Sequence, residues 1–130
     1  MTQPNALPRA LRANALVSLV TGLAGVLMSA PLAQTIGLIQ GTSYQVIGGV
    51  LVGHAALLMW VTGRARIATW ARRNIVGLAA YMLGLLIVLV AGDIATPMGR
   101  TLVMLDGALV AGLALWQVRA LSASTPRPAQ

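Results

Sequence analysis

His54 and Asp106 are the side chains in this sequence best placed to do chemistry, because each is an ionisable residue inside a long apolar run. An imidazole and a carboxylate can together form a proton-transfer couple or an ion-binding site. Placing an ionisable group in a membrane costs roughly 3 kcal/mol or more unless it is paired or hydrated, so such residues are functional candidates. The structural alternative is that Asp106 bonds to a hydroxyl at a helix seam while His54 donates to a backbone carbonyl. The sequence leaves both interpretations open.

The two residues can meet only if the apolar runs that carry them are neighbours. His54 belongs to a predicted span over about 46–62, and Asp106 to one over about 101–118. At about 1.5 Å per residue, His54 lies about 12 Å and Asp106 about 8 Å from the outer end of its span. Two further runs, over about 12–30 and 74–92, are also long enough to cross about 30 Å of hydrocarbon. The sequence therefore predicts four spans.

A ten-residue basic segment between the second and third spans fixes the predicted threading. It carries Arg64, Arg66, Arg72 and Arg73 around Trp70. Several arginines in one short connection are retained on the cytoplasmic side of the membrane. With four spans, eight of the nine arginines fall on that side. We therefore predict an all-α integral membrane four-helix bundle of two helical hairpins in the bacterial inner membrane, with both termini cytoplasmic.

The predicted membrane domain covers 12–119, between cytoplasmic tails over 1–11 and 120–130. A signal peptide is the competing interpretation of the first run, because arginines precede it. The run is longer than a usual signal core, and the residues after it make a poor cleavage site, which favours an uncleaved helix.

The connection over 31–45 has two open interpretations. One is a plain loop, and the other is a short helix in the membrane interface. Such a helix would bury one set of side chains and leave another in water; these are Leu32, Ile36 and Ile39, against Gln34 and Gln40.

Small residues recur at three- and four-residue spacing on all four predicted spans. In lipid they let helices approach closely, so that dispersion and interhelical hydrogen bonds can hold the helices together. The same faces could instead form a groove for a lipid, a quinone or another substrate, or dock partner helices. The residues predicted to pack helices are Ser18, Gly22, Gly25, Gly49, Gly53, Gly77, Gly84, Ala108 and Gly112.

The composition narrows the function classes. With 58% hydrophobic and 8% charged residues, the chain has too little polar surface for an ordinary soluble domain. The net charge of +7 comes from arginines at the ends of apolar runs, so we expect contact with anionic lipid headgroups and no nucleic-acid binding. The headgroup contacts are expected from the basic segment, at Arg64, Arg66, Trp70, Arg72 and Arg73.

The reactive residues are few. One His, two acids and no Cys cannot build a usual metal site, and we expect neither a metal nor a cofactor. The sequence also holds no phosphate-binding loop, dinucleotide fingerprint, nucleophile elbow or zinc-protease motif. We therefore predict that the protein is not an enzyme.

In size, span number and glycine-rich hairpins the chain resembles small four-helix bacterial inner-membrane proteins of unassigned function, such as the DoxX-like group. The resemblance implies a four-helix membrane fold and carries over no site residues. The small multidrug transporters are similar in size and span number, but the membrane-embedded Glu of their first span has no counterpart here.

The sequence favours an accessory or scaffolding subunit that packs against other transmembrane helices or copies of itself. The alternative is a small proton- or ion-coupled transporter that uses Asp106 and His54.

Overall fold

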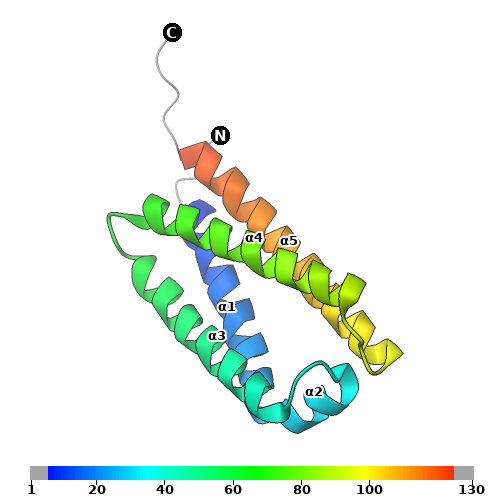
Figure 1. The fold of residues 1–130 in the computed structure, drawn as a ribbon. Coiled ribbons are helices and arrows are strands. Elements are labelled where there is room, and N and C mark those ends of the chain that lie inside the picture. The colour runs from blue at the N-terminus through cyan, green and yellow to red at the C-terminus, as the bar shows by residue number, and fades with distance from the viewer. Residues whose placement is uncertain (1–5, 125–130) are drawn as a thin grey trace.

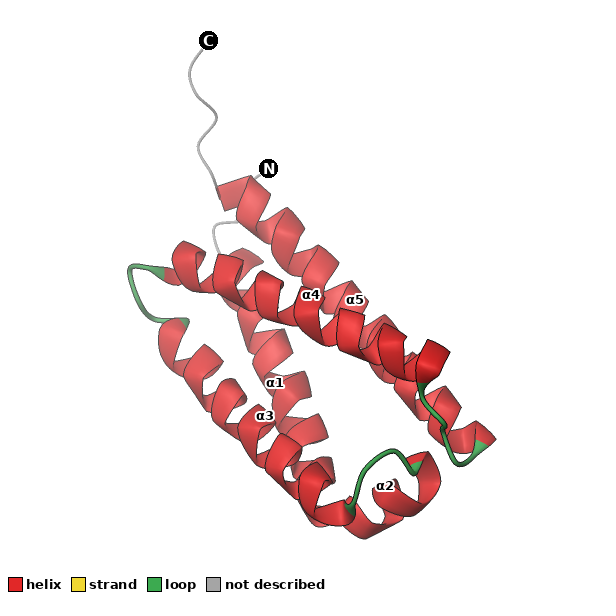
Figure 2. Cartoon of the chain, in the orientation of Figure 1, coloured by secondary structure: helices red, strands yellow, loops and turns green. Residues whose placement is uncertain are grey.

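Five helices make up residues 6–124, the part of the chain that this computed structural model describes (Figures 1 and 2). Four are long and apolar enough to cross a membrane, and between the first two of these lies the short helix α2 (Ser29–Ile36). The predicted all-helical fold with four candidate spans is confirmed, with α2 as a fifth helix. The long helices are α1 (Ala6–Leu27), α3 (Gly41–Val61), α4 (Ile67–Ala91) and α5 (Pro97–Ser124).

Each long helix begins before its predicted span, and α5 also ends after it. α1 begins at Ala6 rather than near 12, and α5 covers Pro97–Ser124 rather than about 101–118. Pro8 and Pro97 lie in the first turns of their helices, where the missing N–H is not needed and the fixed φ favours helix. Hydropathy thus marks the apolar part of each helix but not its ends. Residues 1–5 and 125–130, which hold the remainder of the predicted tails, lie outside the described residues.

Pro31 separates α2 from α1. A proline ring clashes with the carbonyl four residues earlier, and α1 accordingly ends at Leu27. α2 ends at Ile36, and the next residue, Gly37, has a φ of 77°, the left-handed conformation that commonly terminates helices. Of the two interpretations of 31–45, the structure has the short helix, displaced toward the N-terminus. Leu32 and Ile36 are half-buried, whereas Ile39, Gln34 and Gln40 are exposed.

α1 is the central helix of the bundle. It packs along α3 and also contacts α4 and α5. Its closest approach is to Gly48 of α3, where a Cβ added to Gly48 would lie 2.5 Å from the carbonyl oxygen of Gly22 and 2.8 Å from the nitrogen of Val26. Only glycine permits two backbones to come this close. The first hairpin is therefore held by direct backbone contact.

The second hairpin, α4 with α5, is tied to α2 through its turn. The backbone nitrogen of Ala95 donates to the carbonyl of Ile36 at 2.9 Å, and the Thr96 hydroxyl donates to the carbonyl of Thr35 at 2.6 Å. The same hydroxyl accepts from the nitrogen of Gly99 at 3.0 Å and so caps the N-terminus of α5. Carbonyls at the end of α2 thus accept hydrogen bonds that the helix itself does not supply. These bonds attach the α4–α5 turn to α2 at one end of the bundle.

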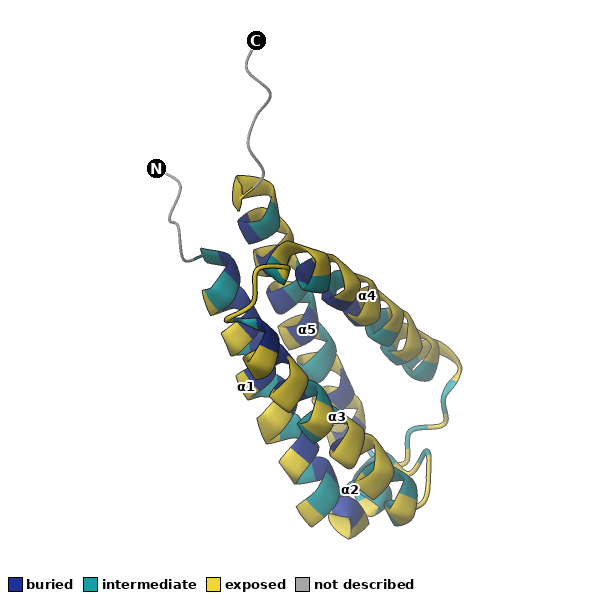
Figure 3. Cartoon of the chain, turned by 90° about the vertical axis from the view of Figure 1, so that its left-hand side faces the viewer, coloured by how far each residue is buried: buried dark blue, intermediate teal, exposed yellow. Residues whose placement is uncertain are grey.

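The two hairpins are unevenly joined. α3 packs against α1 and α2 but not extensively against α4 or α5, and α4 stands apart from α3 in the side view (Figure 3). The buried apolar cluster gathers at the end of the bundle opposite α2 and includes Leu11, Leu58 and Ala120. The bundle is therefore closed around α1 and open between α3 and α4.

Candidate functional site

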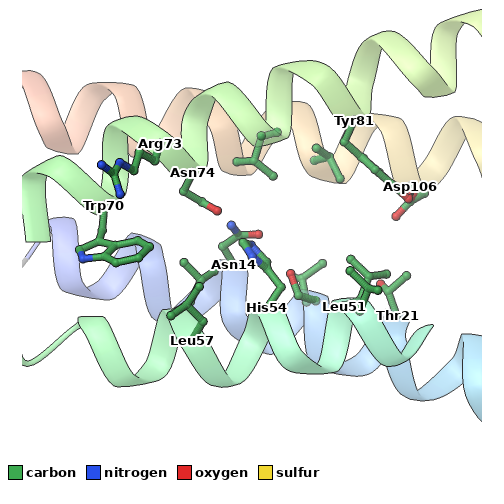
Figure 4. Close-up of a pocket in the computed structure, with 17 residues that line it drawn as sticks. Asn14, Thr21, Leu51, His54, Leu57, Trp70, Arg73, Asn74, Tyr81 and Asp106 are labelled. Carbon is green, nitrogen blue, oxygen red and sulfur yellow. Dashed lines mark hydrogen bonds between the residues drawn. The ribbon is translucent and has the colours of Figure 1, made fainter. Parts of the chain in front are cut away.

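A cavity of about 400 Å³ lies among α1, α3, α4 and α5 (Figure 4). Because α3 and α4 do not pack together along their length, the cavity opens on that side. Most of its lining is apolar, and polar side chains are placed at intervals along it. The apolar lining includes Val17, Leu51, Leu57, Leu58, Leu78 and Val110.

Asp106 pairs with a tyrosine inside this cavity. Tyr81 on α4 donates its hydroxyl to Oδ2 of Asp106 on α5 at 2.6 Å, and both side chains are half-buried. This is the hydroxyl contact that the sequence offered as the structural interpretation of Asp106. The bond joins α4 to α5 across a region where lipid offers a carboxyl group no other partner.

His54 lines the same cavity from α3 (Figure 4). Its side chain points into the cavity beside Asn14, whereas Asp106 lies farther along, next to Tyr81. Within residues 6–124 no hydrogen bond joins His54 to Asp106, and the helices that carry them are not packed neighbours. The structure places the two candidates in one cavity without bringing them into contact.

Three carboxamides lie at the arginine-rich end of the bundle. Asn74 on α4 donates Nδ2 to Oε1 of Gln117 on α5 at 2.8 Å, in a buried contact. Asn14 on α1 is only 2% exposed, and its Nδ2 has no hydrogen-bond partner among the described residues. Asn14 and Asn74 point toward each other into the cavity (Figure 4). A buried donor without a partner costs roughly 1–3 kcal/mol, so the free Nδ2 of Asn14 calls for an explanation.

Sequence reasoning did not find this cluster. Gln117 lies between Trp116 and Val118, close to Arg119, and such a neighbourhood is typical of the membrane interface rather than of a buried contact. The available signal was the recurrence of amide side chains near the same end of three spans.

Arg73 and Trp70 line the cavity at its arginine-rich end. The guanidinium carbon of Arg73 lies 5.5 Å from the centre of the Trp70 ring, in a cation–π contact. Arg64 makes a closer contact of this kind, 4.1 Å above Trp60 at the end of α3, but does not line the cavity. Arg66 and Arg72 also lie outside the cavity, and all four arginines of the segment, including Arg73, are exposed. Of the five predicted headgroup contacts, only Trp70 and Arg73 belong to the cavity.

The residues predicted to pack helices divide into three groups. Ser18, Gly22 and Gly25 are buried on α1, and Gly48 on α3, which was not predicted, is the partner of the two glycines. Gly77 lines the cavity, where an added Cβ would meet nothing within 4 Å. The remaining five are exposed, and at the four glycines among them an added Cβ would meet nothing within 4 Å; these residues are Gly49, Gly53, Gly84, Ala108 and Gly112.

Comparison of the chain with protein-family models, curated proteins and solved structures gives no match. The fold and the cavity define a helical protein with four candidate membrane spans and a laterally open cavity. Ligand pockets in proteins typically enclose about 300–1,000 Å³ and combine an apolar lining with a few placed polar groups. The cavity between α3 and α4 has this size and character.

Proposed function

We propose that this protein is a non-enzymatic, multi-pass protein of the bacterial inner membrane that binds a membrane-soluble molecule between α3 and α4. The observation that carries the proposal is the laterally open cavity of about 400 Å³ with its apolar lining. A molecule dissolved in the bilayer reaches such an opening by lateral diffusion, without passing through water. The groups that line it are suited to holding a ligand and include no nucleophile activated by a base.

The arginine distribution supports an orientation with both termini in the cytoplasm. Arg9, Arg12 and Arg119 lie at the same end of the bundle as the basic segment, and Arg100 lies at the other. Arg127 also belongs to the cytoplasmic set on sequence grounds and lies outside the described residues. Reporter fusions to each terminus test this threading, and reporters on opposite sides of the membrane would refute it.

Filling the cavity tests the binding function. Gly77→Leu places a branched side chain in the cavity. Gly84 lies seven residues along the same helix and is exposed like Gly77, but it does not line the cavity, so Gly84→Leu is the matched control. Membranes containing a fatty acid with a photoreactive diazirine on its acyl chain are irradiated, and the labelled peptides are identified by mass spectrometry. We expect labelling around Leu51 in the wild type and Gly84→Leu, with most of it lost in Gly77→Leu. Equal labelling in all three proteins would refute cavity binding.

A second candidate function is that of an accessory or scaffolding subunit that associates through α3. Gly49 and Gly53 form a G-x-x-x-G pair on an exposed face, where an added Cβ at either position meets nothing within 4 Å. Neither glycine therefore packs against another helix of the same chain. Such a pair permits close approach of α3 from a second copy of the protein.

The absence of cysteine from the chain makes this association testable by disulfide crosslinking. Gly49→Cys should give a covalent dimer on mild oxidation in membranes. Val76→Cys, on an exposed face of α4, is the matched control and should stay monomeric. Monomeric Gly49→Cys, or equal dimerisation of the two variants, would refute association through this face.

A further inference from the structure

We propose that the cavity binds one acyl chain of an anionic glycerophospholipid, with the phosphate at Arg73 and an ester carbonyl at Asn14. The inference rests on the proposed binding function and names the class of ligand. It joins three features of the cavity: a cation at one end, an unpaired buried donor next to it, and an apolar channel beyond.

The positive charge at the arginine-rich end of the cavity favours a ligand with a negatively charged group at that end. Arg73 lines the cavity there, and its contact with Trp70 orients the guanidinium. The neighbouring charges are also positive, because the chain has only two acids. Asp93 lies at the opposite end of α4, and Asp106 lies beyond Tyr81 in the cavity. A guanidinium next to hydrocarbon is a strong partner for phosphate oxygens.

The position of Asn14 along α1 indicates which chemical group of the lipid lies next to it. Asn14 follows Arg12 by two residues on α1, which places it about 3 Å deeper along the helix. Asn74 directly follows Arg73 on α4. In a glycerophospholipid the ester carbonyls lie just below the phosphate, and a carbonyl accepts hydrogen bonds but donates none. The Nδ2 of Asn14, 2% exposed and without a partner among residues 6–124, is the matching donor.

The apolar part of the cavity continues from this point toward the middle of the membrane. Between Asn74 and Tyr81 the helix rises by about 10 Å, a large part of the roughly 15 Å that one leaflet of hydrocarbon provides. Leu51, Leu78 and Val110 line the cavity along its course. The gap between α3 and α4 allows the chain to enter from the side while its headgroup stays at the surface.

Native mass spectrometry of the detergent-solubilised full chain with defined lipids tests the assignment. Diacyl phosphatidylglycerol is compared with diacyl phosphatidylcholine, which lacks the net negative charge, and with dialkyl-ether phosphatidylglycerol, which lacks the ester carbonyls. An isoprenoid quinone supplies a carbonyl without a phosphate. We expect the diacyl anionic lipid to bind most tightly of the four.

Two pairs of variants locate the contacts. Arg73→Gln should weaken binding of the diacyl anionic lipid about fivefold, whereas Arg72→Gln, one residue away and outside the cavity, should leave it nearly unchanged. Asn14→Leu, close in size, should remove the preference for ester over ether lipid, a factor of about five. Gly77→Leu should lower binding of all four molecules, and Gly84→Leu should not.

Equal effects of Arg73→Gln and Arg72→Gln would overturn the phosphate assignment, because the attraction would then be that of the whole basic surface. Tighter binding of the quinone than of the lipid would also overturn it. In both cases retained sensitivity to Gly77→Leu would leave the proposed cavity binding intact. If Gly77→Leu and Gly84→Leu bound every probe alike, both the lipid assignment and the proposed function would fail.

Discussion

Replacing Gly48 by alanine should destabilise the protein, because this residue sets the distance between α1 and α3. The new Cβ would lie 2.5 Å from the carbonyl oxygen of Gly22, whereas ordinary contact begins at 3.4 Å. The atoms it meets are backbone atoms, including the nitrogen of Val26, and they cannot rotate away. The helices must therefore separate by roughly 1 Å, a gap that forfeits a quarter to a half of the dispersion energy of each contact affected. Overpacking of this kind lowers the free energy of unfolding by about 1–3 kcal/mol.

Gly49→Ala is the matched control for this change. It adds the same methyl group one residue along the same helix, where an added Cβ meets nothing within 4 Å, so it changes helix propensity without a clash. Titration with sodium dodecyl sulfate in mixed micelles gives the free energy of unfolding of each variant. We expect Gly48→Ala to be less stable than Gly49→Ala by about 1–3 kcal/mol. Equal stabilities would show that α1 and α3 do not touch through Gly48.

Three further changes test the polar contacts. A double-mutant cycle of Asn74→Leu and Gln117→Leu, followed by the same titration, should give a coupling energy of about 1 kcal/mol; additive effects would contradict the bond between them. Thr96→Ala should lower the free energy of unfolding by about 1 kcal/mol and speed proteolysis of the turn before α5 in detergent. Unchanged proteolysis would contradict the role of Thr96 as a helix cap. If Asp106 carries protons, Asp106→Asn should abolish proton flux that a pH-sensitive dye detects in liposomes holding the wild type; flux that survives the change would exclude Asp106 as the carrier.

The four candidate spans could be predicted because they depend on local composition. A run of about twenty apolar residues forms a helix in lipid whatever lies beside it, since lipid offers its backbone no other hydrogen-bond partners. The break at Pro31 also follows from one residue and its ring. The starts of the helices were harder to place, because Pro8 and Pro97 favour helix beyond the apolar stretch.

The face that each helix turns toward its neighbour could not be predicted in the same way. α3 carries the adjacent glycines Gly48 and Gly49, and the G-x-x-x-G pattern selected Gly49 with Gly53. Adjacent helical residues point about 100° apart, so only one of the two can face α1. In the structure Gly48 faces α1 and packs against Gly22 and Gly25. That choice depends on how the surfaces of two whole helices fit together, which a spacing rule on one helix does not contain.

The cavity itself follows from how helices associate in lipid. α4 is the least buried of the four candidate spans, and its bonds to α5 come from Asn74 to Gln117 and from Tyr81 to Asp106. Acyl chains are as apolar as leucine, so in a bilayer no hydrophobic force drives α4 against α3. Among the described residues no hydrogen bond joins α3 to α4, and the connection between them, over 62–66, places two arginines at the surface. The two polar bonds therefore fix α4 on α5, and the space beside α3 persists as a cavity.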